Sequence, residues 1–315
     1  MAPRLSKLAE YISHREPRAD SPATAALCEI LRGKYGRALQ AVLFYGSCLR
    51  NGNHFDGLLD LYLIVDDYRA TGQSRILNLG NRLLPPNVYY LETAIGGKTV
   101  RCKYALLSFD DFSRGCRSWF HPYIWGRFVQ PTATLFCRSE SLHVSLNRAR
   151  AAAVLKFTTA TLPCLPENFT SEDLWSSGLN SSYASELRPE KPGQGQRLYR
   201  ASQDYYDGLT ELALPESRFG PYLNSAPGKG YQVRIPTGYR ARARQAWKLR
   251  AIQGKILSLL RLAKAAFTFH GGLDYICWKI ERHSGLTLAA PSGKRHNPVS
   301  FMRALGKAWR QRGFH

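Results

Sequence analysis

Two apolar segments in the first part of the chain have the length and composition of buried strands. Residues 40–45 read QAVLFY and residues 58–65 read LLDLYLIV, so only one position of the second segment is charged. A strand without alternation of apolar and polar positions is typical of a sheet covered on both faces. Ahead of them, Ser21 and Pro22 have the residue types of a helix cap and a first helical position. We therefore predict a helix over residues 22–35 that leads into the first strand.

A hairpin follows these two strands. Residues 87–92 and 99–107 are rich in Val, Tyr and Leu and are separated by a Gly-Gly pair, which is a turn signal. Because side chains alternate along a strand, Arg101 and Lys103 share one face of its second strand. Ser108, with an acid three positions later, predicts the start of a helix.

The second half of the chain is predominantly helical in pattern. Helical periodicity runs over residues 139–161 and resumes after Thr170 and again over residues 200–214, with Pro/Gly-rich loops between. We predict an α+β protein with a mixed sheet flanked by helices, followed by a helical domain for which a winged-helix-like arrangement is one option. The predicted division is a sheet domain over 1–138, a helical domain over 139–215, and a basic linker and helical tail over 216–315.

The net charge of the chain is strongly positive and unevenly distributed. The 315 residues carry a formal charge of +21, and residues 231–315 hold seventeen Lys and Arg but two acids, so +15 lies there. Such a balance predicts an anionic partner. The seven cysteines are scattered without a CxxC pair, which argues against a disulfide framework or a zinc site. No apolar run is long enough to cross a bilayer, and we expect no secretory signal.

The candidate chemistry lies where the first strand ends. Gly46-Ser47 follows the first strand, and Asp60 lies on the second strand after twelve intervening residues. This spacing is similar to that of the nucleotidyltransferase superfamily. Glycine lets the backbone approach a phosphate, the hydroxyl and N–H groups donate to it, and the acid can bind Mg²⁺. The alternative is an ordinary turn beside an acid that only ends a buried strand.

One position departs from the superfamily pattern. A second acid is expected two residues after Asp60, on the same strand face, and that position is Tyr62. A site with two carboxylates would need another acid, for which we consider Asp56, Glu92 and Glu186.

Several further motifs occur in an order that resembles the mitochondrial-type phosphatidate cytidylyltransferases, the translocator assembly and maintenance family. The resemblance covers about residues 38–215. The segments that carry it are Tyr45-Gly46-Ser47-Cys48, Leu59-Asp60-Leu61, Val65-Asp66-Asp67, Val88-Tyr89-Tyr90, Lys103-Tyr104, Tyr123-Ile124-Trp125-Gly126-Arg127 with Pro131, residues 165–174 (LPENFTSEDL) and Ser182-Tyr183-Ala184-Ser185-Glu186-Leu187-Arg188. The chain departs from the family in two motifs: the family has glycine where this chain has Cys48, and it has Gly-Asp where this chain has Ser185-Glu186. The first change is expected to tighten the phosphate turn, and the second keeps the charge.

The resemblance implies a transferase that makes CDP-diacylglycerol and pyrophosphate from CTP and phosphatidic acid, with Mg²⁺, in phospholipid and cardiolipin biosynthesis. It implies Asp60 as metal ligand, with Asp56 as a second candidate, and Lys103 and Arg127 as groups that neutralise phosphates. Nucleotide contacts are expected from Tyr45, Gly46, Ser47, Tyr183, Glu186 and Arg188. Several of these residues have an alternative role. Lys103 could be a solvated strand charge, Tyr183 could belong to the core, Arg127 could pair with Asp110 or Asp111, and Glu186 could pair with Arg188.

The basic tail predicts how a lipid substrate is reached. Residues 297–314 have apolar side chains at helical spacing opposite Arg303, Lys307 and Arg310, a pattern typical of helices that lie on anionic membranes. For residues 251–269 we expect a helix that docks on the core with its charges in water. The predicted location is therefore a cytoplasmic or mitochondrial-matrix membrane face, without a transmembrane span.

Two other functions stay open from sequence. One is nucleotide transfer onto a polar acceptor such as RNA or a small molecule. The other is a non-catalytic nucleic-acid-binding protein with a decayed transferase fold. The positive charge of the tail, and Tyr62 in place of the second acid, favour this alternative. We expect no obligate nucleic acid, because the tail shows no RNA-binding signature.

Overall fold

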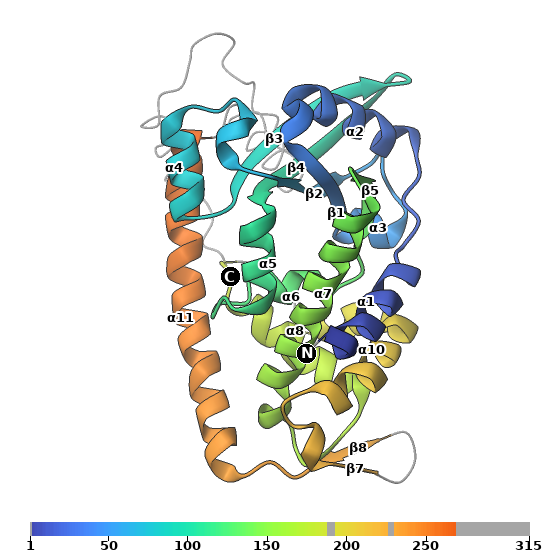
Figure 1. Cartoon of the computed structure of the whole chain (residues 1–315), viewed down its shortest axis with the longest axis vertical. Coiled ribbons are helices and arrows are strands. Elements are labelled where there is room, and N and C mark those ends of the chain that lie inside the picture. Colours follow the sequence, from blue (N-terminus) through green and yellow to red (C-terminus); the bar gives the residue numbers. More distant parts are fainter. Residues whose placement is uncertain (1, 188–192, 226–229, 269–315) are drawn as a thin grey trace, which may run out of the picture.

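The computed structural model describes residues 2–187, 193–225 and 230–268 and confirms the α+β class (Figure 1). The helices of the first half are α1 (Ala2–His14), α2 (Pro22–Tyr35), α3 (Ser47–Asn51), α4 (Arg75–Leu83), α5 (Phe109–Arg117) and α6 (Trp125–Phe128). Those of the second half are α7 (Glu140–Thr161), α8 (Ser171–Tyr183), α9 (Gln194–Arg200), α10 (Gln203–Glu216) and α11 (Thr237–Thr268).

A five-stranded mixed sheet forms the centre of the first half. Its strands are β1 (Leu39–Tyr45), β2 (Leu58–Val65), β3 (Asn87–Ile95), β4 (Lys98–Ser108) and β5 (Ala133–Cys137), in the order β3-β4-β2-β1-β5. The pair β2 and β4 is parallel and the other neighbours are antiparallel. The two predicted buried strands and the predicted hairpin are confirmed.

Both faces of the sheet are covered, as the apolar pattern of β2 predicts. Leu59, Leu61 and Leu63 point into a cluster packed under α2, whereas Tyr62 and Ile64 point into a larger cluster shared with the helices below the sheet. Figure 1 shows α2 above the sheet and α5 and α7 below it. Because β2 alternates between two apolar layers, Asp60 is held on the larger cluster's face at the end of the strand.

The helix starts follow the predicted caps. Ser21 caps α2, with Pro22 at its first position, and Ser108 accepts from the N–H of Asp111 at the start of α5. Thr170 and Asp173 form a capping box at α8. Side chains of this kind satisfy N–H groups that a helix leaves free at its first turn.

The helices of the second half pack against the sheet domain. The larger cluster contains residues from both sides of position 138, among them Phe128 and Phe157. The Phe157 ring packs against the rings of Trp125 and Trp175. A small sheet in the order β6-β8-β7 lies further down, formed by β6 (Asn168–Phe169), β7 (Leu223–Ser225) and β8 (Tyr231–Val233). The predicted domain division and the winged-helix-like option stay predictions.

The long helix α11 runs along one side of the molecule, from the small sheet up to α4 (Figure 1). Its inward face carries Trp247, which packs on Trp125 at 5.7 Å between ring centroids. Gly254 permits the closest approach, because a Cβ there would lie 2.2 Å from the carbonyl oxygen of Ser185. The expectation that this helix keeps its charges in water is wrong for Arg261 and Lys264, which face inward and bond to main-chain carbonyls.

Among the helices that the structure describes, none combines the length and apolar character that crossing a membrane requires. The predicted basic helix over 297–314 lies outside the described residues.

Candidate nucleotidyl-transfer site

Three polar side chains form one row across the sheet. The register places Tyr45 of β1 opposite Asp60 of β2, and Asp60 opposite Lys103 of β4. All three project from the same face, where the sheet meets the helices below. The Lys103 ammonium lies 2.7 Å from Asp60 Oδ1, and each of these side chains is 21% exposed. The structure therefore places Asp60 and Lys103 next to each other, and their roles in metal and phosphate binding stay predictions.

The turn before α3 lies directly over the Asp60 carboxylate. Gly46 has φ of +96°, a conformation that side-chain-bearing residues rarely adopt. A Cβ on Gly46 would meet Asp60 Oδ2 at 3.0 Å, so glycine is needed both for the turn and for room beside the acid. Ser47 begins α3 and is exposed to solvent, where its hydroxyl is accessible to a ligand.

Cys48, which replaces the glycine of the family motif, turns away from the site. Its side chain is buried and its thiol donates to the Leu58 carbonyl oxygen at 3.3 Å. A Cβ on Gly57 would lie 2.7 Å from this sulfur, so a glycine at 57 makes room for the cysteine. The cysteine is thus accommodated on the α2 side of the sheet. Its side chain lies outside the turn, so it does not tighten the turn in the way the sequence led us to expect.

Arg127 of α6 lies at the centre of the site. Its Nη1 donates to the Tyr62 hydroxyl at 3.0 Å, and its Nη2 lies 2.6 Å from Glu186 Oε1. The aspartates considered as alternative partners pair with Arg114 instead. Burial by itself lowers the pKa of Arg127, but Glu186 and the neighbouring tyrosines outweigh this and raise it well above its ordinary value. The guanidinium therefore stays charged.

Tyrosine rings surround this arginine. The Arg127 Cζ atom lies 4.4 Å from the centre of the Tyr123 ring and 5.6 Å from that of Tyr45. Burial raises the pKa of Tyr45 to about 12 and raises the pKa of Tyr62 well above its ordinary value, in both cases against the opposing effect of Arg127, so both are neutral hydroxyls. They are hydrogen-bonding groups, not bases.

Arg261 of α11 completes the cluster, and the sequence reasoning missed it. Its Cζ atom lies 4.0 Å from the centre of the Tyr123 ring, so two guanidinium groups stack on one phenol. Burial lowers the pKa of Arg261, which Tyr123 partly offsets. Tyr123 was visible within the Gly126-Arg127 motif, whereas nothing in the sequence links Arg261 to a motif more than a hundred residues away.

The remaining predicted residues are placed as follows. The Tyr183 hydroxyl donates to Gln130 Oε1 at 3.3 Å, one turn beyond Arg127. Asp56 is exposed in the loop before β2, where the Asn53 side chain accepts from its N–H at 2.9 Å. Arg188 lies outside the described residues. The roles of all three stay predictions.

The acidic residues of the site fit a metal ion held by one carboxylate and a ligand better than a metal ion held by protein carboxylates alone. Asp60 is the strand carboxylate, Tyr62 occupies the second acid position, and Glu186 is paired with Arg127. Among the residues that the structure describes, no group of three His, Cys, Asp or Glu side chains converges on a metal position. Magnesium often binds one or two carboxylates and takes its other ligands from water and substrate phosphates. The residues present therefore fit a magnesium ion held by Asp60 and a nucleotide, and not a site built from protein carboxylates alone.

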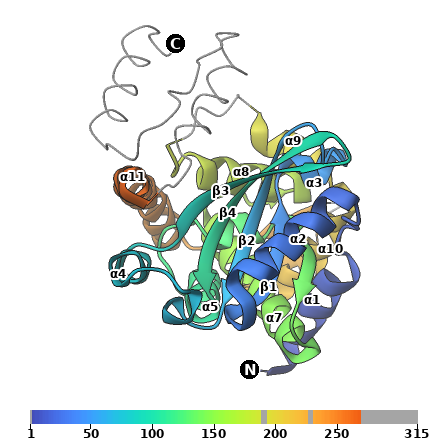
Figure 2. The ribbon, with the colours of Figure 1, turned by 90° about the horizontal axis from the view of Figure 1, so that it is seen from above.

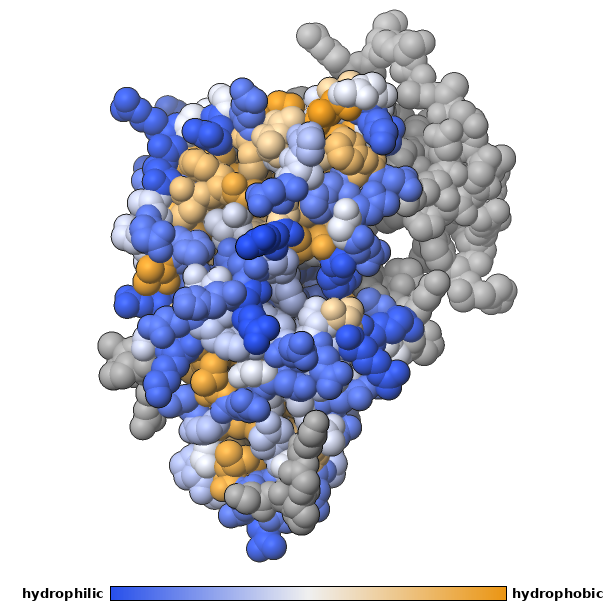
Figure 3. Space-filling view, turned by 90° about the vertical axis from the view of Figure 1, so that its right-hand side faces the viewer, coloured by the Kyte–Doolittle hydropathy of each residue, from blue (hydrophilic) through white to orange (hydrophobic). Residues whose placement is uncertain are grey.

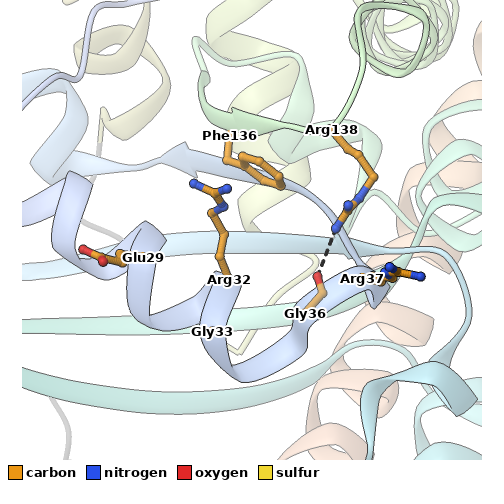
Figure 4. Close-up of a pocket in the computed structure, with 7 residues that line it drawn as sticks. All are labelled: Glu29, Arg32, Gly33, Gly36, Arg37, Phe136 and Arg138. Atoms are coloured by element: carbon orange, nitrogen blue, oxygen red, sulfur yellow. Dashed lines mark hydrogen bonds between the residues drawn. The ribbon is translucent and has the colours of Figure 1, made fainter.

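A separate pocket lies between α2 and β5 (Figure 4). It has a volume of about 520 Å³ and is lined by Glu29, Arg32, Gly33, Gly36, Arg37, Phe136 and Arg138. Arg138 Nη2 donates to the Gly36 carbonyl at 2.9 Å. None of the predicted site residues lines this pocket, so it is not part of the candidate site.

The sheet, the glycine turn and the adjacent acid are the features of a nucleotidyltransferase. Residues 66–197 match the family model described as "Phosphatidate cytidylyltransferase, mitochondrial". This match confirms the resemblance and the enzyme class predicted from the sequence. It covers less than half of the chain; Lys103, Arg127 and Glu186 lie inside it, whereas Gly46 and Asp60 precede it.

No curated protein matches the chain. Among solved structures, the chain is similar to a nucleotidyltransferase-like protein from Exiguobacterium sibiricum 255-15, with 12% identity, coverage of 92% of this chain and 90% of that chain, and a TM-score of 0.27.

Proposed function

We propose that this protein is a CTP:phosphatidate cytidylyltransferase that forms CDP-diacylglycerol and pyrophosphate. The observation that carries the proposal is the row of Tyr45, Asp60 and Lys103 beside the Arg127–Glu186 pair, together with the family match that includes the last three. Both substrates are phosphates, so the site must bind two groups of negative charge.

The charges of the site suit two phosphorylated substrates. Lys103, Arg127 and Arg261 are cationic, and Asp60 and Glu186 are anionic, so these five side chains carry a net charge of +1. Cations in a partly buried site are weakly screened and attract phosphate more strongly than they would in water. Lys103 is held against Asp60, and we expect it to donate to a triphosphate bound next to the Gly46 turn.

The reaction needs little from the protein beyond binding and charge. A phosphate oxygen of phosphatidic acid attacks the α-phosphorus of CTP, the new P–O bond forms, and the bond to the β-phosphate breaks so that pyrophosphate leaves with the electron pair. The nucleophile is already anionic at neutral pH, so no strong general base is required. A magnesium ion on Asp60 would neutralise charge on the triphosphate during this step. Arg127 would hold a phosphate in line, and Tyr45 and Tyr62 would exclude water around it.

The test is an assay with labelled CTP, phosphatidic acid and magnesium. We expect label in the lipid extract for the wild-type protein, and a loss of at least about a hundredfold for Asp60→Ala. The matched control is Asp66→Ala, because Asp66 is an exposed acid at the other end of the same strand. Transfer to RNA or a water-soluble acceptor, without lipid product, would reject the proposal in favour of the polar-acceptor alternative.

A further inference from the structure

The helix α4 is turned with its polar side inward. Asn81 is fully buried, where its amide donates to the Leu106 carbonyl at 3.1 Å and its oxygen accepts from the Asn87 N–H at 2.6 Å. The apolar side chains of the helix point into solvent: Ile76 is 82%, Leu79 57% and Leu83 75% exposed. An amphipathic helix on a globular protein ordinarily has the opposite orientation, because its apolar stripe is what it buries.

The outer face of α11 repeats this arrangement over a greater length. While Trp247, Gly254 and Arg261 face the core, the outer face carries an apolar stripe at spacings of three and four residues. The side chains of the stripe are between 50% and 59% exposed, and they are Leu249, Ile252, Ile256, Leu259 and Leu260.

The two helices lie side by side (Figure 1 and Figure 2). Lys264 of α11 donates to the carbonyl oxygens of Gly80 and Leu84 at the end of α4, and of Pro86 just beyond it, and Arg261 donates to that of Pro85. Of the thirteen large apolar side chains that are exposed in the described part of the chain, eight belong to α4 and α11. Figure 3 shows the opposite side of the molecule, where hydrophilic groups predominate and smaller apolar patches lie chiefly in the upper part. Apolar groups concentrated in this way indicate a surface that meets an apolar partner.

The charges on these helices indicate what that partner is. Neither helix contains an acidic residue, whereas α11 has eight basic residues and α4 has two, Arg75 and Arg82. Arg75 and Arg82 flank the stripe of α4, and Lys248 and Lys255 flank that of α11. A second copy of the chain would bring like charges together, and RNA would not cover aliphatic side chains. An anionic bilayer satisfies both features, since it takes up leucine and isoleucine below a layer of negative headgroups.

We propose that the outer faces of α4 and α11 form one surface that docks on an anionic lipid bilayer. This docking surface deepens the proposed function and rests on it, because phosphatidic acid, the proposed acceptor, lies in such a bilayer. The same helix that carries the apolar stripe outward presents Arg261 inward to Tyr123 of the site. Docking would therefore hold the site next to its lipid substrate without a membrane-spanning segment.

Vesicle flotation tests the surface independently of catalysis. The full chain is mixed with vesicles of phosphatidylcholine, or of phosphatidylcholine with phosphatidylglycerol, an anionic lipid that is not the proposed substrate. We expect flotation with the anionic vesicles, and a loss of at least about tenfold in the bound-to-free ratio for the combined variant Leu79→Gln, Leu83→Gln, Ile256→Gln and Leu260→Gln.

The matched control is Ile30→Gln with Val144→Gln, which replaces exposed apolar residues of α2 and α7 and is expected to float like the wild type. Circular dichroism and thermal melting establish that each variant is folded. Because the replaced side chains are already in water, their removal is not expected to unfold the protein. If the four-residue variant floats as well as the wild type, the surface proposal is overturned.

A second measurement separates the surface from the reaction. Transfer is assayed with short-chain phosphatidic acid dispersed in detergent, where docking on a bilayer is not needed. We expect the four-residue variant to retain wild-type turnover there. Flotation that depends on these residues in a protein that makes no lipid product would uphold the surface and reject the proposed function. Lipid product from a protein whose flotation does not depend on these residues would uphold the proposed function and reject the surface.

Discussion

Arg127 donates a hydrogen bond to the hydroxyl of Tyr62 at 3.0 Å, at the strand position where a second carboxylate would be expected. The tyrosine is fully buried, with its ring 4.9 Å from that of Phe128 and 5.3 Å from that of Tyr45. The arrangement therefore places a neutral hydroxyl and a guanidinium where a second carboxylate was expected. In the proposed reaction, this guanidinium would add to the positive charge that Lys103 provides beside Asp60.

Replacing Tyr62 with phenylalanine tests this relationship. Tyr62→Phe keeps the ring packing and removes the acceptor, so we expect a stability loss of about 1 kcal/mol. Arg127 keeps Glu186 but loses one of its two orienting bonds, so we expect turnover to fall by about tenfold with little change in KM for CTP. Steady-state kinetics and thermal unfolding measure the two effects. Unchanged turnover would mean that Glu186 and the ring contacts suffice to orient the arginine.

The Arg127–Glu186 pair predicts a strong and non-additive effect on stability. Both side chains are nearly buried, with exposures of 9% and 12%, and they join α6 to the segment after α8. Glu186→Gln leaves a buried guanidinium without its carboxylate, which is expected to cost about 3 kcal/mol. Arg127→Met combined with Glu186→Gln should cost less than the sum of the two single changes, because neither charge is then left alone.

Urea unfolding of the single and double variants completes this cycle. The matched control is Arg200→Gln, which breaks an exposed pair with Glu172 and is expected to change the free energy of unfolding by less than about 1 kcal/mol. Additive losses at Arg127 and Glu186 would show that the two side chains are not energetically coupled.

The elements near the site follow from local sequence, whereas its charge pairing does not. The apolar runs of β1 and β2, the Gly-Gly hairpin and the cap at Ser108 are each encoded within a few residues, and they place Asp60 and Lys103 at neighbouring positions once β2 and β4 pair. The partner of Arg127 is instead set by the packing of α8 and α11, which local patterns do not specify. The sequence therefore indicates only the nearby aspartates as alternative partners of Arg127, and it does not indicate Arg261.

Orientation of the amphipathic helices is a further feature that periodicity leaves open. The spacing of apolar residues in α11 predicts a helix with one apolar side, but it does not say whether that side meets the core. The side that faces inward is the one on which Trp247 packs against Trp125 and Gly254 lies close to the Ser185 backbone, and these fits depend on the tertiary structure.

Gly254 therefore predicts how closely α11 must approach the site. Gly254→Ala would place a methyl group 2.2 Å from the Ser185 carbonyl oxygen, a backbone atom that cannot rotate away. We expect a loss of about 1–3 kcal/mol from this overpacking and a fall in turnover, because Glu186 is the next residue. Gly33→Ala is the matched control: a Cβ there meets nothing within 4 Å, and alanine in a helix is expected to be neutral or stabilising by up to about 1 kcal/mol. Thermal unfolding with the transfer assay measures both, and equal behaviour of the two variants would contradict the close approach.

His121 predicts a loss of stability in mild acid. Its ring is buried beside Trp119, and burial, with a smaller contribution from Arg261 and Lys156, lowers its pKa to about 3. The unfolded chain, with a histidine pKa near 6.5, binds a proton that the folded protein does not, so the stability is present above about pH 6.5 and is lost as the pH falls toward 3. We expect the free energy of unfolding to drop by about 2 kcal/mol from this group between about pH 7 and pH 5. His121→Gln should remove that part of the pH dependence, and His14→Gln, at an exposed position of α1, should keep it. Urea unfolding across this range measures the slope, and a His121→Gln protein as sensitive to acid as the wild type would show that the imidazole is protonated in the folded state.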